Sequence, residues 1–113
     1  MTLAVNQWYR VADTGQFAQV QRIPSTTDPR ISVPRADQNT RGFEVALVWY
    51  TPVAASSTGW TKRVLIMETR KALALLREPG DADRTVLVRL KAVAATIPVS
   101  SASRDGEFTL DRP

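Results

Sequence analysis

The sequence predicts a mostly β protein, folded as a single antiparallel β-sandwich or barrel-like domain. We expect an N-terminal hairpin, an extended proline-rich arm or loop, and at most one short helix. Short apolar runs rich in β-branched and aromatic residues alternate with turn residues, as in small β domains. The length of 113 residues fits one domain, and 43% hydrophobic residues is ordinary for a globular chain. The predicted divisions are a hairpin (7–23), an arm or loop (24–40), a sheet core (42–97) and a C-terminal arm (98–113).

The longest apolar run, GFEVALVWYTP over residues 42–52, is the expected central strand. Read with a period of two, it is apolar on both sides, with Phe43, Val45, Leu47 and Trp49 on one face and Glu44, Ala46, Val48 and Tyr50 on the other. A strand of this kind must be covered on both faces. We therefore expect either a second layer within the chain or a partner subunit.

Residues 7–23 predict a hairpin. Candidate strands Gln7–Val11 and Phe17–Ile23 flank the segment ADTG, in which aspartate and glycine favour a turn. An isolated hairpin is only marginally stable, so this one is expected to dock on the rest of the domain.

Prolines recur every five residues in the segment 24–40, among Ser, Thr, Asp and Arg. Proline removes a backbone donor and biases the preceding residue toward extended geometry. The pattern predicts an extended arm with a possible short edge strand at Ile31–Val33, or else an ordinary solvated loop. If the segment is an arm, its candidate interface residues are Pro24, Pro29, Arg30, Ile31, Val33, Pro34 and Arg35.

A small-residue connection, 53–59, leads to Trp60–Glu68, whose run VLIM predicts a second buried strand beside the central one. Thr69–Glu78 is open to two interpretations. Its residues are good helix formers, with Thr69 as a possible cap and Pro79-Gly80 as a stop. It also alternates as a strand that a turn at 79–83 joins to a further strand at 85–93, and we slightly favour this second interpretation.

The remaining segments are expected to be a strand at 85–97, straight or bent near Ala94, and then a polar loop or arm at 98–106. A short edge strand is possible at Phe108–Leu110, and the last three residues are expected to fray.

The composition limits the chemistry. The chain has no cysteine and no histidine, which excludes disulfides, thiolate metal sites and a Ser-His-Asp triad. Asp81 and Asp83 fit a turn better than a calcium loop, which needs more ligands. No phosphate-binding glycine motif is present. We expect no catalytic residues, no metal and no cofactor, and a carboxylate-based enzyme is the least favoured class.

The aromatic residues and arginines allow a nucleic-acid hypothesis, in which aromatic rings stack on bases and arginines contact phosphates. The net charge is +4, and most basic residues are arginines. The candidate residues are Trp8, Arg10, Arg22, Tyr50, Arg63, Arg70 and Arg89. The alternative is that Trp49 and Trp60 anchor the core and Trp8 docks the hairpin.

These observations favour a non-enzymatic structural protein that self-associates or binds a protein shell. The most plausible example is a virus or phage virion subunit, as a coat or capsid-decorating protein. The expected partners are copies of itself or other structural subunits, and possibly nucleic acid. No apolar run spans a membrane and the N-terminus lacks a signal-peptide pattern, so the expected location is a virion or the host cytoplasm. The alternative is a small nucleic-acid-binding β-barrel.

Overall fold

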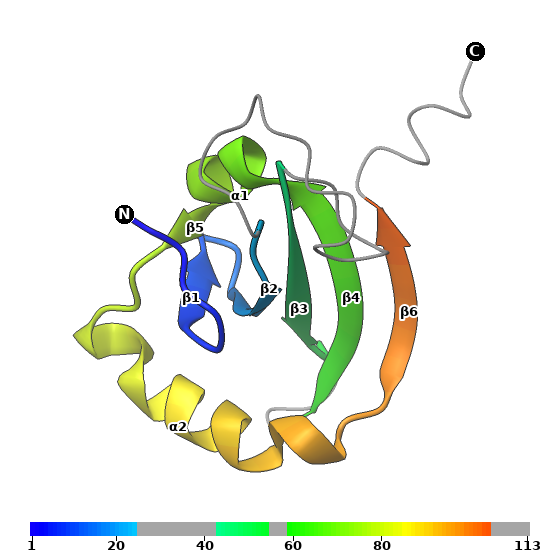
Figure 1. Ribbon diagram of the computed structural model, residues 1–113. Helices are drawn as coiled ribbons and strands as arrows, with labels where there is room; N and C mark the ends of the chain where they lie inside the picture. The colour runs from blue at the N-terminus through cyan, green and yellow to red at the C-terminus, as the bar shows by residue number, and fades with distance from the viewer. Residues whose placement is uncertain (25–42, 55–58, 105–113) are drawn as a thin grey trace.

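A six-stranded mixed sheet forms the centre of the structure, a computed structural model that describes residues 1–24, 43–54 and 59–104 (Figure 1). In spatial order the strands are β5 (Leu76–Arg77), β1 (Trp8–Val11), β2 (Gln16–Arg22), β3 (Glu44–Pro52), β4 (Trp60–Glu68) and β6 (Val99–Arg104). All neighbours are antiparallel except β4 and β6, which are parallel. The mostly β prediction is confirmed, but the described strands form one open sheet and the pairing is not wholly antiparallel.

The predicted N-terminal hairpin is present as β1 and β2, paired from Trp8 opposite Gln19 to Val11 opposite Gln16. The connecting turn uses positive φ angles at Ala12 (37°) and Gly15 (80°). The Thr14 hydroxyl donates to the Val11 carbonyl at 2.7 Å and closes the turn.

The predicted central strand is also confirmed, because β3 lies between β2 and β4 in the sheet. All seven residues from Glu44 to Tyr50 are buried. Its partner β4 covers the range predicted from the sequence, and Leu47 lies opposite both Val20 and Leu65.

One face of the sheet packs beneath the N-terminal segment and helix α1 (Thr69–Leu75). From β3 this face carries Val45, Leu47 and Trp49, all buried. Leu3 from the N-terminal segment and Ala72 from α1 complete the cluster.

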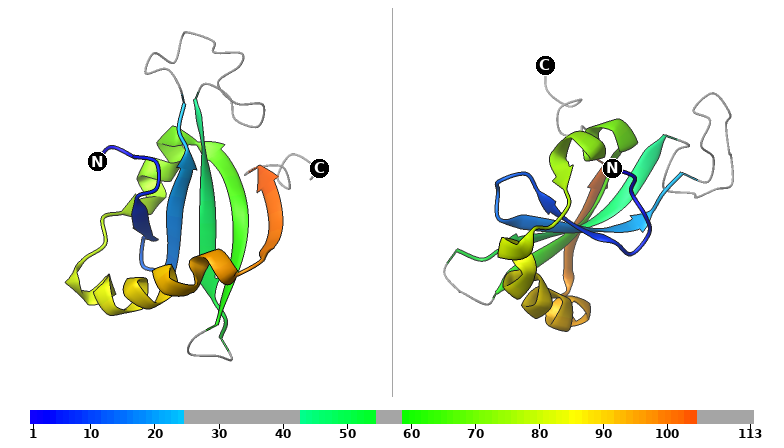
Figure 2. Two further views of the ribbon diagram at one scale, coloured as in Figure 1. Left: turned by 60° about the horizontal axis from the view of Figure 1, so that its bottom comes forward. Right: turned by 90° about the vertical axis from the view of Figure 1, so that its left-hand side faces the viewer.

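The other face packs beneath helix α2 (Arg84–Val93), which crosses several strands (Figure 2). Leu87 and Leu90 of α2, with Ala94 just after it, contact Val48 and Tyr50 of β3. The chain therefore covers both faces of β3 itself. The expected second layer is present, and the apolar character of β3 does not require a partner subunit.

The favoured strand interpretation of Thr69–Glu78 is wrong for most of its length. Helix α1 occupies Thr69–Leu75, and only Leu76 and Arg77 are extended, as β5 paired with β1. Thr69 does not cap the helix, because its hydroxyl donates to the Phe43 carbonyl at 3.0 Å. The good helix formers of this segment therefore determine its conformation as far as Leu75. The helix ends there, and Leu76 is buried in the core.

The strand predicted at 85–97 is wrong as well, because α2 occupies Arg84–Val93. The β-branched residues of this run suggested a strand, but Leu87, Leu90 and Ala94 recur at helical spacing and are buried. Burial of that stripe outweighs the weak strand preference of the valines. The two α-helices exceed the single helix predicted.

The turn predicted at 79–83 instead leads into α2 through η1 (Asp81–Asp83), with the Gly80 amide donating to Asp83 Oδ2 at 2.8 Å. The segment 98–106, predicted as a loop or arm, contains β6 over Val99–Arg104. The possible strands at Ile31–Val33 and Phe108–Leu110 lie outside the described residues.

Candidate interaction site

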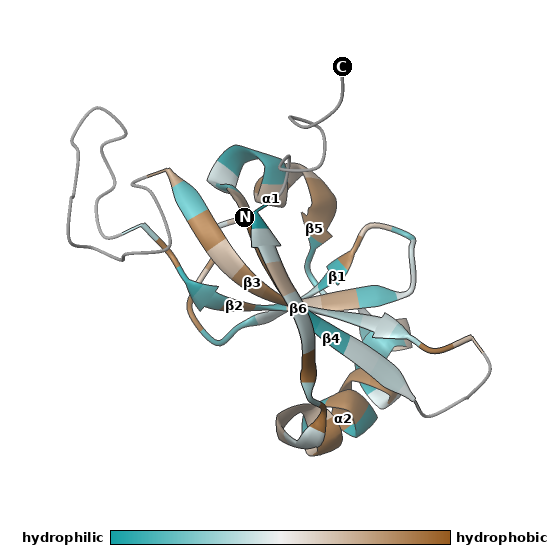
Figure 3. Ribbon diagram, turned by 90° about the vertical axis from the view of Figure 1, so that its right-hand side faces the viewer, coloured by the Kyte–Doolittle hydropathy of each residue, from teal (hydrophilic) through white to brown (hydrophobic). Residues whose placement is uncertain are grey.

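The outer edge of β6 is the main candidate for an interaction site. Among the described strands β6 pairs only with β4. Residues 99–102 are exposed, and Val99 is 51% exposed. Natural edge strands are usually protected by lysine, proline, strong bulges or shortness. Between Val99 and Arg104 the residues are only serine and alanine, which appear as pale segments along β6 in Figure 3.

The strand is fixed to the sheet near both of its ends. Near its start the Ser100 hydroxyl donates to the Lys62 carbonyl of β4 at 2.9 Å. At its end Arg104 forms an ion pair with Glu44 of β3, whose side chain is 5% exposed. These two contacts attach β6 to its neighbours β4 and β3 within the single chain.

The opposite edge of the sheet is different. It is formed by β5, which contains only Leu76 and Arg77, and by Trp8 and Tyr9 of β1, which β5 does not reach. Leu76 is buried, and Arg77 Nη1 donates to two local carbonyls, those of Ala74 and Leu76. A two-residue edge offers few backbone groups to another strand. The two edges of the sheet are therefore unequal, and β6 is the longer.

The sequence-predicted interface residues do not belong to this edge. Pro24 follows β2 and is half-buried. The other six, Pro29, Arg30, Ile31, Val33, Pro34 and Arg35, lie outside the described residues. Sequence reasoning missed β6 because a strand of serines at a sheet edge lacks the apolar alternation of a half-buried strand.

An aromatic cluster fills the space between α2 and the sheet. The rings of Trp8 and Tyr50 stack with centroids 5.1 Å apart, and Phe17 and Trp60 meet edge to face at 6.1 Å. Lys62 Nζ lies 5.8 Å from the Tyr50 ring centroid and donates to the Ala94 carbonyl just beyond α2. Burial raises the pKa of the Tyr50 phenol above its usual value. The cluster thus anchors α2, in line with the core interpretation of the tryptophans.

The residues of the nucleic-acid hypothesis do not form one surface. Tyr50 is 2% exposed and cannot stack on a base. Arg10 lies on the α2 face and contacts Asp13 and Asp83 at 3.1 and 3.6 Å. Arg63 lies opposite Trp49, on the other face of the sheet. The rest are dispersed, with Arg22 on β2, Arg70 on α1 and Arg89 on α2.

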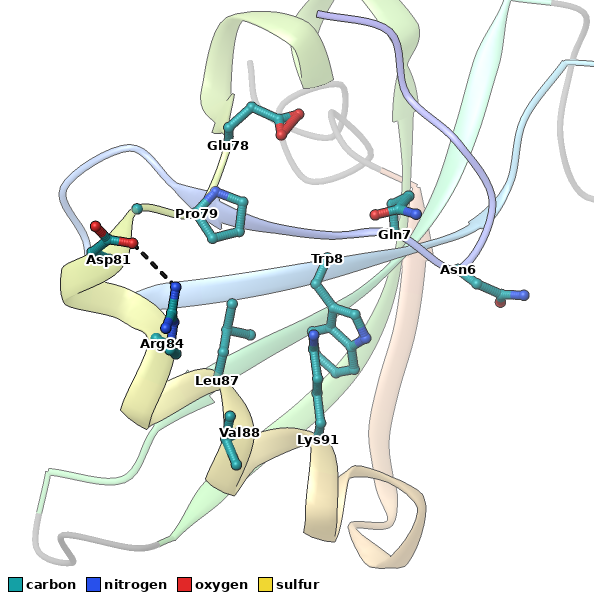
Figure 4. A pocket seen from close by; sticks show the side chains of 11 residues that line it. Asn6, Gln7, Trp8, Glu78, Pro79, Asp81, Arg84, Leu87, Val88 and Lys91 are labelled. Atoms are coloured by element: carbon teal, nitrogen blue, oxygen red, sulfur yellow. Dashed lines mark hydrogen bonds and ion pairs between the residues drawn. The ribbon is translucent and has the colours of Figure 1, made fainter.

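A groove of about 580 Å³ lies beside the exposed edge of Trp8 (Figure 4). Three segments line it: residues 6–8, residues 78–81, and one side of α2. Arg84 of α2 pairs with Asp81 across one wall at 3.3 Å. The groove thus combines an aromatic ring with charges of both signs.

Within the described ranges, no group of three or more acidic, histidine or cysteine residues is placed to hold a metal ion. No helix in that part of the chain is both long enough and apolar enough to cross a bilayer. Comparisons with known proteins give no match to a family model, a curated protein or a solved structure.

Proposed function

We propose that this chain is a non-enzymatic assembly protein whose copies associate along the outer edge of β6. The observation that carries the proposal is the inequality of the two sheet edges. One edge consists of the two-residue strand β5 and the two β1 residues that β5 does not reach, whereas the other presents a six-residue strand that has one register shift at Ser100 and no lysine or proline. Addition of a strand to such an edge is a common mode of protein association.

A second copy of the chain is the occupant that we propose for this edge. Two β6 strands related by a two-fold axis would pair antiparallel and join the two sheets, since a two-fold interface brings the same surface of both copies together. The small side chains of Ser101, Ala102 and Ser103 permit close approach. Val99, which is half exposed in one copy, would become covered in the pair.

We further propose that the chain serves as a coat or decorating subunit of a virus or phage particle. The support for this proposal is the absence of cysteine and histidine from the sequence, together with the open sheet edge among the described strands, which is suited to assembly. The nature of the proteins encoded beside this gene tests it. Shell or tail proteins would favour a virion subunit, and a set of metabolic enzymes would count against one.

Nucleic-acid binding is a weaker proposal because its candidate residues lie on both faces of the sheet. Such binding would fall steeply with salt, since phosphate contacts release counterions. A salt-dependent affinity in titration with single-stranded DNA or RNA would favour this alternative.

The direct test introduces lysine at the edge, as Ser101→Lys with Ala102→Lys. Both positions are exposed, so the monomer should fold, while edge lysines oppose strand addition. Light scattering over a concentration series should show self-association of the unmodified chain and a monomer for the variant. The matched control, Thr85→Lys with Ala92→Lys, adds the same charge at exposed positions of α2 and should associate normally. Equal masses for the edge variant and the control would contradict the proposal.

A further inference from the structure

The groove beside Trp8 is separate from the β6 edge. Its walls come from residues 6–8, from residues 78–81, and from α2, whereas β6 lies at the opposite side of the sheet (Figure 1). Trp8 is half-buried, and one side of its ring is held by the stack on Tyr50. The indole is thus a fixed apolar surface in an open groove.

Two charged side chains of the groove have no ion pair within the part of the chain that the structure describes. Arg84 and Asp81 pair with each other, but Glu78 and Lys91 form no such contact there. Figure 4 shows Glu78 next to Pro79 on one side of the groove and Lys91 on the other side, where its side chain overlaps the Trp8 ring in this view. The groove therefore has an available anion at one end and an available cation at the other.

The remaining lining suits an extended backbone. Asn6 and Gln7 place exposed side-chain amides on the rim. Asn6 has a left-handed backbone with φ of 71°, and its backbone N–H donates to the Val20 carbonyl. Side-chain amides both donate and accept hydrogen bonds, as a peptide backbone requires. On the α2 wall, Val88 is 62% exposed and extends the apolar surface of Trp8.

We propose that this groove binds an extended peptide segment of a partner protein. The segment carries a basic side chain for Glu78, an acidic side chain for Lys91, and a proline or aliphatic side chain between them for the Trp8 ring. Charge complementarity favours this occupant. A nucleic-acid strand fits poorly, because its phosphates would face Glu78 and Asp81. This inference does not depend on association through β6.

The test uses synthetic peptides with blocked ends, each with a central Pro-Leu unit and serine spacers of graded length. One series carries a lysine and a glutamate at its two ends, a second two glutamates, and a third two lysines. Anisotropy of labelled peptides reports binding, and so does the intrinsic fluorescence of the chain, to which Trp8, Trp49 and Trp60 contribute. The mixed-charge series should bind most tightly to the unmodified chain, and each reversed charge should weaken binding about fivefold, as for partly exposed ion pairs.

Charge-reversal variants make the assignment specific. Glu78→Lys should shift the preference to the peptides with two glutamates, and Lys91→Glu should shift it to those with two lysines. The control Arg89→Glu changes a charge on the outward side of α2, beyond the groove lining. It should leave the preference unchanged.

Several results would overturn the proposal. These are equal binding of all three series, preferences that do not follow the two reversals, or displacement of the peptide by a single-stranded oligonucleotide at low concentration. The self-association of Glu78→Lys and Lys91→Glu, measured by light scattering, should equal that of the unmodified chain. A loss of peptide preference with intact self-association thus separates this site from the β6 edge.

Discussion

At the scale of single residues, Tyr50 of β3 connects the sheet to the helix α2 that covers it. Its ring stacks on Trp8 and lies under the ammonium group of Lys62, which also donates to the Ala94 carbonyl. A cation above an aromatic ring and near a helix C-terminus is favoured in both contacts. The sequence marked Trp8 and Tyr50 as notable, but it did not reveal that they stack on each other.

The titration of Tyr50 is expected to lower the stability of the fold at alkaline pH. Burial raises the pKa of its phenol in the folded chain above the unfolded value of 10.0, so the folded state holds this proton more tightly. The resulting stabilisation is complete below pH 10 and is lost as the pH rises through the folded pKa. Urea unfolding from neutral pH to above pH 10 should therefore show a falling free energy of unfolding.

Comparison with Tyr50→Phe isolates this effect from the titration of other groups. The variant keeps the ring and removes the ionisable hydroxyl. Its free energy of unfolding should decline less steeply above pH 10 than that of the unmodified chain. Parallel declines for the two proteins would show that Tyr50 does not contribute to the alkaline loss of stability.

At the scale of elements, α2 is where local pattern and tertiary packing disagree. Val86, Val88 and Leu90 alternate as in a strand, whereas Leu87, Leu90 and Ala94 are the positions that become buried. A short run of valines and leucines supports both periods, and only the neighbouring sheet decides between them. The segment that became α1 had clear helix formers, yet the expected pairing partner at 85–93 favoured a strand there. The first error therefore caused the second.

The packing of α2 predicts unequal effects of two similar substitutions. Leu90 is fully buried, so Leu90→Ala should lower the free energy of unfolding by about 2–5 kcal/mol through lost burial and a cavity. Val86 on the same helix is 42% exposed, so Val86→Ala should cost less than about 1 kcal/mol. Urea denaturation monitored by circular dichroism measures both. Similar losses for the two variants would mean that α2 does not pack on the sheet through Leu90.

At the scale of the whole molecule, the sequence was informative about strands with strong apolar character and uninformative about edges. The hairpin, β3 and β4 were predicted because their β-branched and aromatic residues define a buried surface. The topology was not predictable, since the parallel pairing of β6 with β4 depends on the route taken by α2. The candidate edge is made of serine and alanine, which leave no pattern in the sequence.

The role of the edge changes the physical basis of the assembly hypothesis. The sequence argument allowed either a second layer of the chain or a partner subunit to cover β3, and α1, α2 and the N-terminal segment provide that cover. What supports association instead is the row of backbone groups along β6. An assembly based on such an edge is specified by strand pairing rather than by an apolar surface.

The most direct measurement places a single spin label on this strand. The chain has no cysteine, so Ser101→Cys gives one label on β6 and Thr85→Cys gives one on the outward side of α2. Neighbouring strands lie about 5 Å apart, so pairing of two β6 strands should bring the Ser101→Cys labels close together. The account predicts strong dipolar broadening for that label at concentrations where the chain self-associates, and much weaker broadening for the α2 label. An associated protein whose Ser101→Cys labels show no broadening would contradict it.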